Sequence, residues 1–409
     1  MPRLKEKNSA SIWSVPFVLL MIINFFDTLC FQMLRTMMTQ YAMDIGIATA
    51  QATALASVLS IASLVMRPVA GRLVDTINNK LIMTLSYVGM VITMILYFLA
   101  KSYPLLMFVR LLNGAFYGIS AVVTMTIAGS MLPEEKMGQG ISMFGMGLAV
   151  AITFSSMIGA WLYSFGAGVL FAASLASMII ALTLSMFVPN VKRKMSTEKK
   201  SVGQILRGLV AVEAIPVAVL NLIFNLAYSA SAVFLVVYFN AKTGEGNPIG
   251  TIGVFFMVWG LMLFVARPVG GKLFDRYGLV PAELLFLVCL GLYLFLISIS
   301  TGWVMSLIAA LIGSFGFGGS VPVLQAAAFV SAPPERKGAA NSTNLMGGDL
   351  GSAIGGVLFG QIATWFVREG QASFSYQVCL RVGACMCALA LVYLFILGRN
   401  PKYRRKKAE

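Results

Sequence analysis

The sequence predicts an all-α integral membrane protein with twelve transmembrane helices in two similar six-helix halves. Of its 409 residues, 59% are hydrophobic and 11% are charged, whereas soluble proteins carry about 25% charged residues. Long apolar runs recur along the whole chain. One stretch of the first half also returns in the second half at a fixed offset, which indicates that the chain repeats one large unit.

Twelve apolar runs are long enough to cross a bilayer, since a spanning helix needs roughly 20 residues. They cover residues 13–34, 48–68, 81–100, 104–130, 139–163, 167–189, 213–239, 250–268, 280–300, 303–330, 338–366 and 375–398. The longest polar linker follows the sixth run. We therefore expect an N-terminal half at 1–190, a cytoplasmic linker at 191–212, a C-terminal half at 213–398 and a basic cytoplasmic tail at 399–409.

The basic residues lie mainly in alternate loops. If the N-terminus is cytoplasmic, 24 of the 30 Lys and Arg residues fall on the cytoplasmic side, which is the bias expected of a membrane protein. The net charge of +15 therefore indicates orientation in the cell membrane, with both termini cytoplasmic, rather than binding to nucleic acid. No cleavage site separates the basic N-terminus from the first run, so we expect a retained first span.

Several classes of function are disfavoured by the residues that the chain lacks. It contains no histidine, and its five cysteines lie in apolar runs without metal-site spacing, so we expect no metal site and no cofactor. No hydrolase, metalloprotease or phosphate-loop motif is present, and an enzyme is not expected. A channel filter and a soluble sensor domain are absent as well. Carboxylates remain as the carriers of any proton.

The repeated stretch reads RPVAGRLVD from Arg67 to Asp75 and RPVGGKLFD from Arg267 to Asp275, an offset of 200 residues (267 − 67). Each copy joins two apolar runs. An aspartate in such a loop can accept bonds from helix N-termini and basic neighbours, so we expect the loops to hold the cytoplasmic side closed. A charge cluster that only sets topology is the alternative. The predicted gating residues are Arg67, Gly71, Arg72, Asp75, Arg267, Gly271, Lys272, Asp275 and Arg276.

Small residues recur one helical turn apart in the fifth and eleventh runs. The fifth run contains Gly147, Ala151, Ser155 and Gly159, and the eleventh contains Gly347, Gly351 and Gly355. Small residues at this spacing let helix backbones approach closely in lipid. We expect the two runs to form close-packing seams between the halves.

Two segments resemble motifs of a known family. The segment 71–75, closing at Lys80, resembles the signature loop between spans 2 and 3 of the major facilitator superfamily, and 275–278 keeps more of that signature. The segment 110–114, Arg-Leu-Leu-Asn-Gly, resembles the Arg-x-x-Gln-Gly motif of its drug/proton antiporters. The resemblance implies a twelve-helix transporter that works by alternating access and is functional as a monomer. The fifth run lacks the proline kink of those antiporters, which argues against proton antiport.

Charged residues inside the apolar runs are functional candidates, because each costs about 2.5–3.5 kcal/mol to insert. Asp27 and Arg110 lie at similar depths when counted from the predicted span ends at 34 and 104. We expect them to face each other, either as a site where substrate and protons compete or as a permanent ion pair. Asp349 is expected to be a second such site or to bond exposed backbone. Glu213 and Glu283 are expected to be interfacial and structural.

Uncharged polar residues lie on the same helix faces. Asn24 shares a face with Asp27, whereas Asn113 and Tyr117 share one with Arg110. Asn221, Asn225 and Tyr228 follow one stripe of the seventh run. We expect these residues to line a substrate site, with bonding between helices as the alternative for the last three.

These observations predict a secondary active transporter. The expected cargo is a small, amphipathic organic solute, and the expected mode is proton-coupled efflux. A proton-coupled symporter or a uniporter for a small metabolite is the alternative. The expected partners are the solute, protons and the lipid bilayer.

Overall fold

A computed structural model describes residues 12–47, 49–190, 210–243, 249–300, 302–368 and 372–400. These residues form twelve long helices, and the predicted all-α fold is confirmed. The predicted boundaries of the halves stay a prediction, and most of the predicted linker (191–209) and tail (401–409) lies outside the described residues. The helices are α1 (Val15–Asp44), α2 (Thr49–Thr76), α3 (Asn79–Leu99), α4 (Tyr103–Ser130), α5 (Met137–Ser164), α6 (Ala167–Phe187), α8 (Ile215–Thr243), α9 (Ile249–Tyr277), α10 (Leu279–Ile299), α11 (Trp303–Ser331), α12 (Lys337–Arg368) and α13 (Ala372–Gly398).

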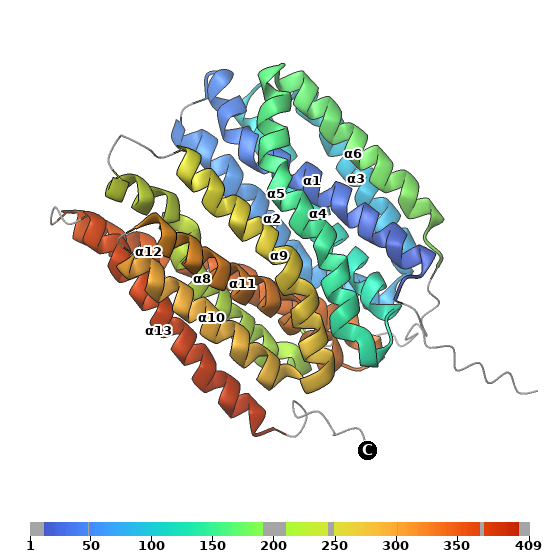
Figure 1. Cartoon of the computed structure of the whole chain (residues 1–409). Helices are drawn as coiled ribbons and strands as arrows, with labels where there is room; N and C mark the ends of the chain where they lie inside the picture. The colour runs from blue at the N-terminus through green and yellow to red at the C-terminus, as the bar shows by residue number, and fades with distance from the viewer. Residues whose placement is uncertain are drawn as a thin grey trace, which may run out of the picture.

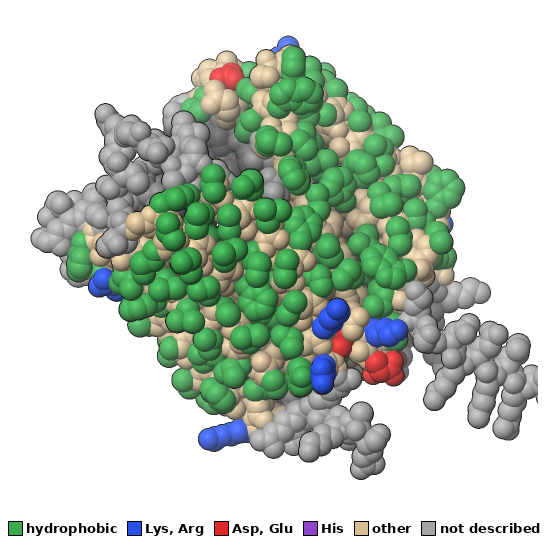
Figure 2. Space-filling view, viewed as in Figure 1, with side chains coloured by type: hydrophobic (Ala, Val, Ile, Leu, Met, Phe, Trp, Pro, Cys, Tyr) green, Lys and Arg blue, Asp and Glu red, His purple; other side chains and the backbone are tan. Residues whose placement is uncertain are grey.

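The helices form because a chain in lipid must satisfy its own backbone groups. Nine of them, within the described residues, contain a stretch long and apolar enough to cross a membrane; the other three, α2, α5 and α12, are of similar length. Some ends are capped in the usual way, since the Asn78 side chain accepts a hydrogen bond from the backbone N–H of Lys80 at 3.0 Å. Apolar side chains cover most of the face in Figure 2, and charged ones gather toward one end.

Helices α1–α6 lie on one side of the molecule and α8–α13 on the other (Figure 1). The packing inside the two groups follows one pattern. Helix α1 contacts α5 and α2 contacts α4, just as α8 contacts α12 and α9 contacts α11. The two groups meet mainly where α5 contacts α9 and where α2 contacts α12. The repeat in the sequence is therefore a repeat in the structure, with the two halves related by the 200-residue offset.

Three helices extend well beyond the apolar runs that predicted them. Helix α1 continues to Asp44 rather than residue 34, α2 to Thr76 rather than 68, and α9 to Tyr277 rather than 268. Both copies of the repeated stretch consequently lie inside helices, and their prediction as loops was wrong. A helix bonds its backbone internally whether or not its side chains are apolar, so hydropathy marks the membrane-embedded part and not the end of the helix.

The small-residue ladders pack within each half, so the predicted seam between the halves was wrong for them. A methyl group added at Gly147 or Gly159 would meet Met21 or Met33 of α1. One added at Gly347 or Gly351 would collide with the backbone of α8. In the same ladders, Gly355 lies against Ser229 and Leu226 of α8, and Ala151 and Ser155 are buried in α5. The ladders set the close approach of α5 to α1 and of α12 to α8.

Candidate functional site

The two repeated aspartates connect the halves at one end of the molecule. Asp75 of α2 accepts hydrogen bonds from the backbone N–H groups of Gly338 and Ala339, at 2.9 and 2.8 Å. Asp275 of α9 accepts the equivalent bonds from residues 138 and 139, at 2.7 and 2.9 Å. Each carboxylate thus caps the N-terminus of a helix in the opposite half, where free N–H groups and the helix dipole favour negative charge. We call this end of the molecule, which carries Asp75 and Asp275, the latch end.

Glycines allow the helices to approach at the latch end. A methyl group at Gly71 would collide with Ser342 and lie 2.9 Å from the carbonyl oxygen of Gly338. A methyl group at Gly271 would collide in the same way with Ser142 and Gly138. The glycines of the repeat therefore let the helices come close enough for the aspartates to accept their hydrogen bonds.

The basic residues of the repeat surround these contacts. Lys272 and Arg276 are exposed on α9, and the Arg276 guanidinium lies 5.1 Å from the centre of the Tyr277 ring. Arg72 is half-buried on α2. Arg267 is only 4% exposed and lies against Gly145 of α5. The prediction placed all of them in one type of loop, but they occupy different depths along two helices.

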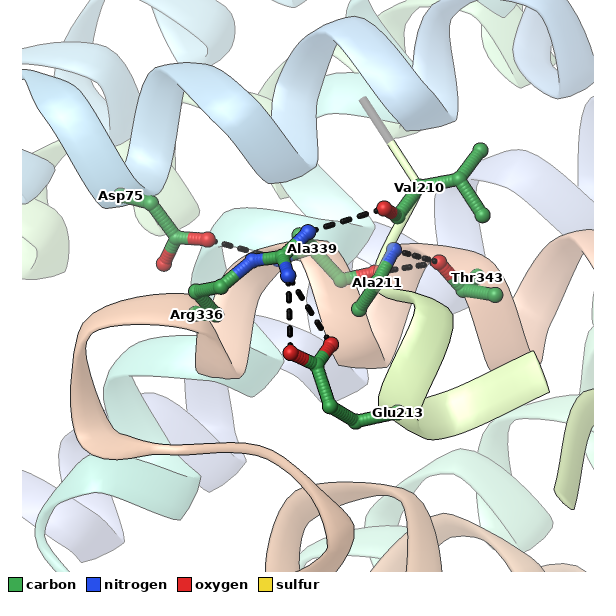
Figure 3. A network of polar contacts seen from close by, with 7 residues as sticks. All are labelled: Asp75, Val210, Ala211, Glu213, Arg336, Ala339 and Thr343. Carbon is green, nitrogen blue, oxygen red and sulfur yellow. Dashed lines mark hydrogen bonds and ion pairs between the residues drawn. The ribbon is translucent and has the colours of Figure 1, made fainter. Parts of the chain in front are cut away.

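A polar network continues from Asp75 into the C-terminal half (Figure 3). The guanidinium of Arg336, just before α12, donates to both carboxylate oxygens of Glu213 at 2.9 and 3.0 Å. It also donates to the carbonyl oxygen of Val210 at 2.9 Å. The backbone N–H of Ala211 donates to the Thr343 hydroxyl at 3.0 Å. The chain that enters α8 is thereby tied to the helix N-terminus that Asp75 caps, and Glu213 has the structural contacts expected of it.

A second connection between the halves lies deeper in the molecule. Arg67 of α2 and Asp349 of α12 form an ion pair, with 2.8 Å between Nη1 and Oδ2. Arg67 lies nine residues from the end of α2 at Thr76 (76 − 67), about 13 Å along the helix. The Arg67 side chain is 12% exposed and that of Asp349 is 35% exposed. Asp349 was predicted as a site for protons or substrate. In the structure it pairs with Arg67, which was predicted as a gating residue.

Asp27 is buried inside the N-terminal half. It is 2% exposed, and its Oδ2 accepts hydrogen bonds from Ser120 of α4 at 2.8 Å and from Tyr87 of α3 at 3.3 Å. The Tyr87 hydroxyl lies 3.0 Å from that of Thr124. Oδ1 has no hydrogen-bond partner among the described residues. A buried carboxylate with one free oxygen can take up a proton without breaking its existing bonds.

Arg110 does not face Asp27, and the predicted pair is absent. The Arg110 side chain is fully buried, and none of its three nitrogens has a hydrogen-bond partner in the described part of the chain. Its neighbour is the Tyr97 hydroxyl of α3. Arg110 and Asp27 thus occupy separate places within one half.

The length of α1 explains this error. Asp27 lies 17 residues from the end of α1 (44 − 27), and Ser120 lies 17 residues from the start of α4 (120 − 103). Arg110 lies only 7 residues from that start (110 − 103), so it is ten residues, about 15 Å, nearer the surface. The depth of Asp27 was counted from residue 34, which placed it too close to the outside.

The uncharged candidates divide between helix packing and the space between the halves. Asn113 is buried and donates to Thr93 of α3 at 3.1 Å. Asn221 donates to the backbone of Asn344 at 2.8 Å, and Asn225 donates to Asn221. These amides bond within and between helices, which favours the alternative left open for Asn221 and Asn225. Asn24 is half-buried on α1.

Two aromatic pairs occupy equivalent places in the two halves. Tyr117 of α4 stacks on Phe31 of α1, with ring centres 3.7 Å apart. Phe317 of α11 contacts Tyr228 of α8, with ring centres 4.3 Å apart. Positions 117 and 317 are related by the repeat. The four rings are partly or largely buried, and each pair joins the first and fourth helix of its half.

The comparisons with known proteins agree with this architecture. The model of the Major Facilitator Superfamily matches residues 20–356 and 284–409. The chain belongs to the major facilitator superfamily.

Relatives within the superfamily are similar over most of their length. The multidrug resistance protein MdtG of Citrobacter koseri is 25% identical over 364 residues, covering 86% of this chain and 84% of that protein. The multi-drug resistance efflux pump PmrA of Streptococcus pneumoniae is 28% identical over 275 residues, covering 60% and 66%. A crystal structure of the superfamily transporter FucP in the outward conformation has a TM-score of 0.76 at 14% identity, covering 93% and 99%. The protein is thus a membrane transporter of this superfamily.

Sequence reasoning missed several residues of the transporter that the repeat itself could have revealed. Ser142 and Ser342 lie against the opposite half at the latch end and are separated by 200 residues. Ser120, which bonds Asp27, has its equivalent in Ser320. Glu283 was predicted to be interfacial, but it is fully buried beside Ser320. That prediction was wrong because α11 packs closely on the first turns of α10, where Phe286 lies against Gly319.

Proposed function

We propose that this transporter exports a small, amphipathic organic solute in exchange for protons. The observation that carries the proposal is the closed latch end, where two equivalent aspartates cap helices of the opposite half. Alternating access requires contacts between the halves that form in one conformation and break in the other, and these four hydrogen bonds would serve that purpose. A single chain supplies both halves and both latches, so a monomer is sufficient.

The distribution of basic residues supports one orientation of the transporter in the membrane. The latch end is assigned to the cytoplasmic side, because 24 of the 30 Lys and Arg residues fall there in the predicted topology. Both termini are then cytoplasmic, and the opposite end faces outward across the cell membrane. The described state is consistent with a transporter closed to the cytoplasm.

Asp27 is the proposed site of the transported proton. It is a buried carboxylate of the N-terminal half, and its Oδ1 has no hydrogen-bond partner among the described residues. Tyr117 lies near both Asp27 and the Arg67–Asp349 pair. Asp349 is the second carboxylate proposed to respond to substrate. The names of MdtG and PmrA support export of organic compounds.

Reconstituted vesicles test the coupling. Export should accelerate when a pH gradient drives protons toward the latch side, and Asp27→Asn should abolish that response while leaving exchange of labelled solute intact. Asp44→Asn, at the exposed end of α1, is the matched control and should behave as wild type. Acceleration by the opposite gradient would identify a symporter, and wild-type coupling in Asp27→Asn would remove this carboxylate from the mechanism.

A further inference from the structure

The space between the halves contains more positive than negative charge. Arg67 and Asp349 neutralise each other at 2.8 Å. Arg35 of α1 is exposed, and no carboxylate of the described residues lies within ion-pair distance of it. Arg35 nevertheless lies close enough to Asp349 and to Tyr117 to act on both through space. One guanidinium is therefore left without a counter-charge beside the ion pair.

Helix geometry places Arg35 above the aromatic pair of the N-terminal half. Phe31 stacks on Tyr117, and Arg35 follows Phe31 by four residues on the same face of α1. Arg35 is thus one turn farther from the latch end than the stacked rings. This position is on the side of the molecule that the latch contacts leave open.

Neither carboxylate of α1 pairs with Arg35. Asp44 lies nine residues later (44 − 35) and accepts a hydrogen bond from Gln40 at 2.7 Å. Asp27 lies eight residues earlier on α1 (35 − 27), about 12 Å along the helix, and is 2% exposed. Its bonds go to Ser120 and Tyr87. The buried guanidinium of Arg267, which lies against Gly145 where α9 contacts α5, adds further positive charge between the halves, since it forms no ion pair with a described carboxylate. Charges in a low-dielectric surrounding raise the local concentration of ions of opposite sign.

We infer that the site between the halves accepts an amphipathic organic anion, with its acidic group between Arg35 and Arg67 and its apolar body between the two aromatic pairs. A cation would have to replace Arg67 as the partner of Asp349, and it would then be repelled by the positive charge of Arg35. The inference rests on the proposed function, because it names the class of solute for the same site. Arg35 becomes the residue that determines the charge of the cargo.

The membrane potential gives such an anion a preferred direction. The potential acts on every net charge that crosses the membrane. An inside-negative potential therefore drives an anion outward, and it drives a proton inward. In the orientation proposed above, the membrane potential would favour both the export of the anion and the entry of the proton.

Three probes of matched shape test the inference: 2-naphthoxyacetate, its neutral amide and 2-(2-naphthoxy)ethylammonium. Saturable binding is measured on the full-length protein in nanodiscs, with binding to empty nanodiscs subtracted. Wild type should bind the carboxylate at least tenfold more tightly than the amide or the ammonium. Arg35→Gln should remove this preference, and Arg35→Glu should shift it to the ammonium. The aromatic rings alone could also bind the ammonium probe, because aromatic faces attract cations. The comparison between probes of different charge therefore tests the role of Arg35.

Arg381→Gln is the matched control, because Arg381 is exposed on α13, a helix whose main contacts are with α8, α10 and α12 of its own half. It should keep the preference of wild type. The inference is overturned if wild type binds the carboxylate no more tightly than the other probes, or if the preference survives in both Arg35 variants. Selective binding of the carboxylate without any response of transport to pH would instead refute the proposed proton coupling and leave this inference standing.

Discussion

Arg67 and Arg267 occupy equivalent positions in the two halves, but their surroundings differ. Arg67 pairs with Asp349, whereas the equivalent of Asp349 is Ala149 (349 − 200). Arg267 is 4% exposed and its Nε has no hydrogen-bond partner in the described part of the chain. One substitution between the copies therefore leaves a single deep ion pair between the halves. The asymmetry resides in one side chain.

Removing one partner of that pair should destabilise the protein. Arg67→Met would leave Asp349 without its ion-pair partner, and we expect a loss of about 1–3 kcal/mol in the free energy of unfolding. The loss is smaller than for a fully buried pair because Asp349 is 35% exposed. Arg67→Met combined with Asp349→Leu should recover part of the loss. Unfolding followed by tryptophan fluorescence in denaturant measures Arg67→Met, Asp349→Leu and the double variant. Strictly additive losses would show that the pair contributes nothing.

At the scale of the helix, small side chains determine how closely α12 can approach α8. A methyl group at Gly351 would collide with the backbone of Leu222, whereas one at Gly356 would meet nothing within 4 Å. The two glycines lie on the same helix, five residues apart. Their difference is therefore one of packing and not of local backbone.

Gly351→Ala should cost about 1–3 kcal/mol of stability, because the helices must separate to accept the methyl group. Gly356→Ala should be neutral or stabilising by up to about 1 kcal/mol, since alanine favours the helix. Thermal unfolding of the two variants in the same detergent gives the comparison. Equal melting temperatures would mean that the ladder does not set the packing of α12 on α8.

At the scale of the whole molecule, the two latches close one end symmetrically. Each consists of a carboxylate that accepts two backbone N–H groups at 2.7–2.9 Å. Hydrogen bonds to a charged group contribute about 1.5–3 kcal/mol each. In the transport cycle proposed above, the balance between the closed and open latch end would depend on these four bonds and on the deep ion pair.

Replacing the latch carboxylates should open the latch end. Asp75→Asn should shift part of the population to a longer distance between the halves, and Asp75→Asn with Asp275→Asn should shift most of it, since an amide offers one acceptor and no charge. Spin labels at positions 135 and 335, both exposed at the latch end, report the distance by pulsed electron resonance in a cysteine-free background. Glu134→Gln in the same exposed turn is the control. An unchanged distance distribution in the double variant would exclude the latch role.

Much of the architecture could be predicted because the bilayer imposes it. Apolar length gave all twelve helices, and the 200-residue offset gave the two halves and the residues of the latch. The superfamily followed from the same segments. Predictions failed where they needed the rotation or the true end of a helix. Asp27 was predicted to face Arg110 because α1 was expected to end at residue 34. The glycine ladders were predicted to contact the opposite half, because a row of small residues does not specify which helix packs against it.

The sequence by itself was enough to predict a membrane protein, the number of long helices, the repeat and the transporter family. Each of these depends on composition or spacing along one chain. Only the tertiary structure decided which side chains meet. It placed Asp27 against Ser120 and Tyr87, left Arg110 without an ion pair, and joined Arg67 to Asp349 across 282 positions (349 − 67). The physical reason is that hydropathy records how deep a residue lies, whereas a hydrogen bond or ion pair also depends on the direction in which each helix turns its side chains.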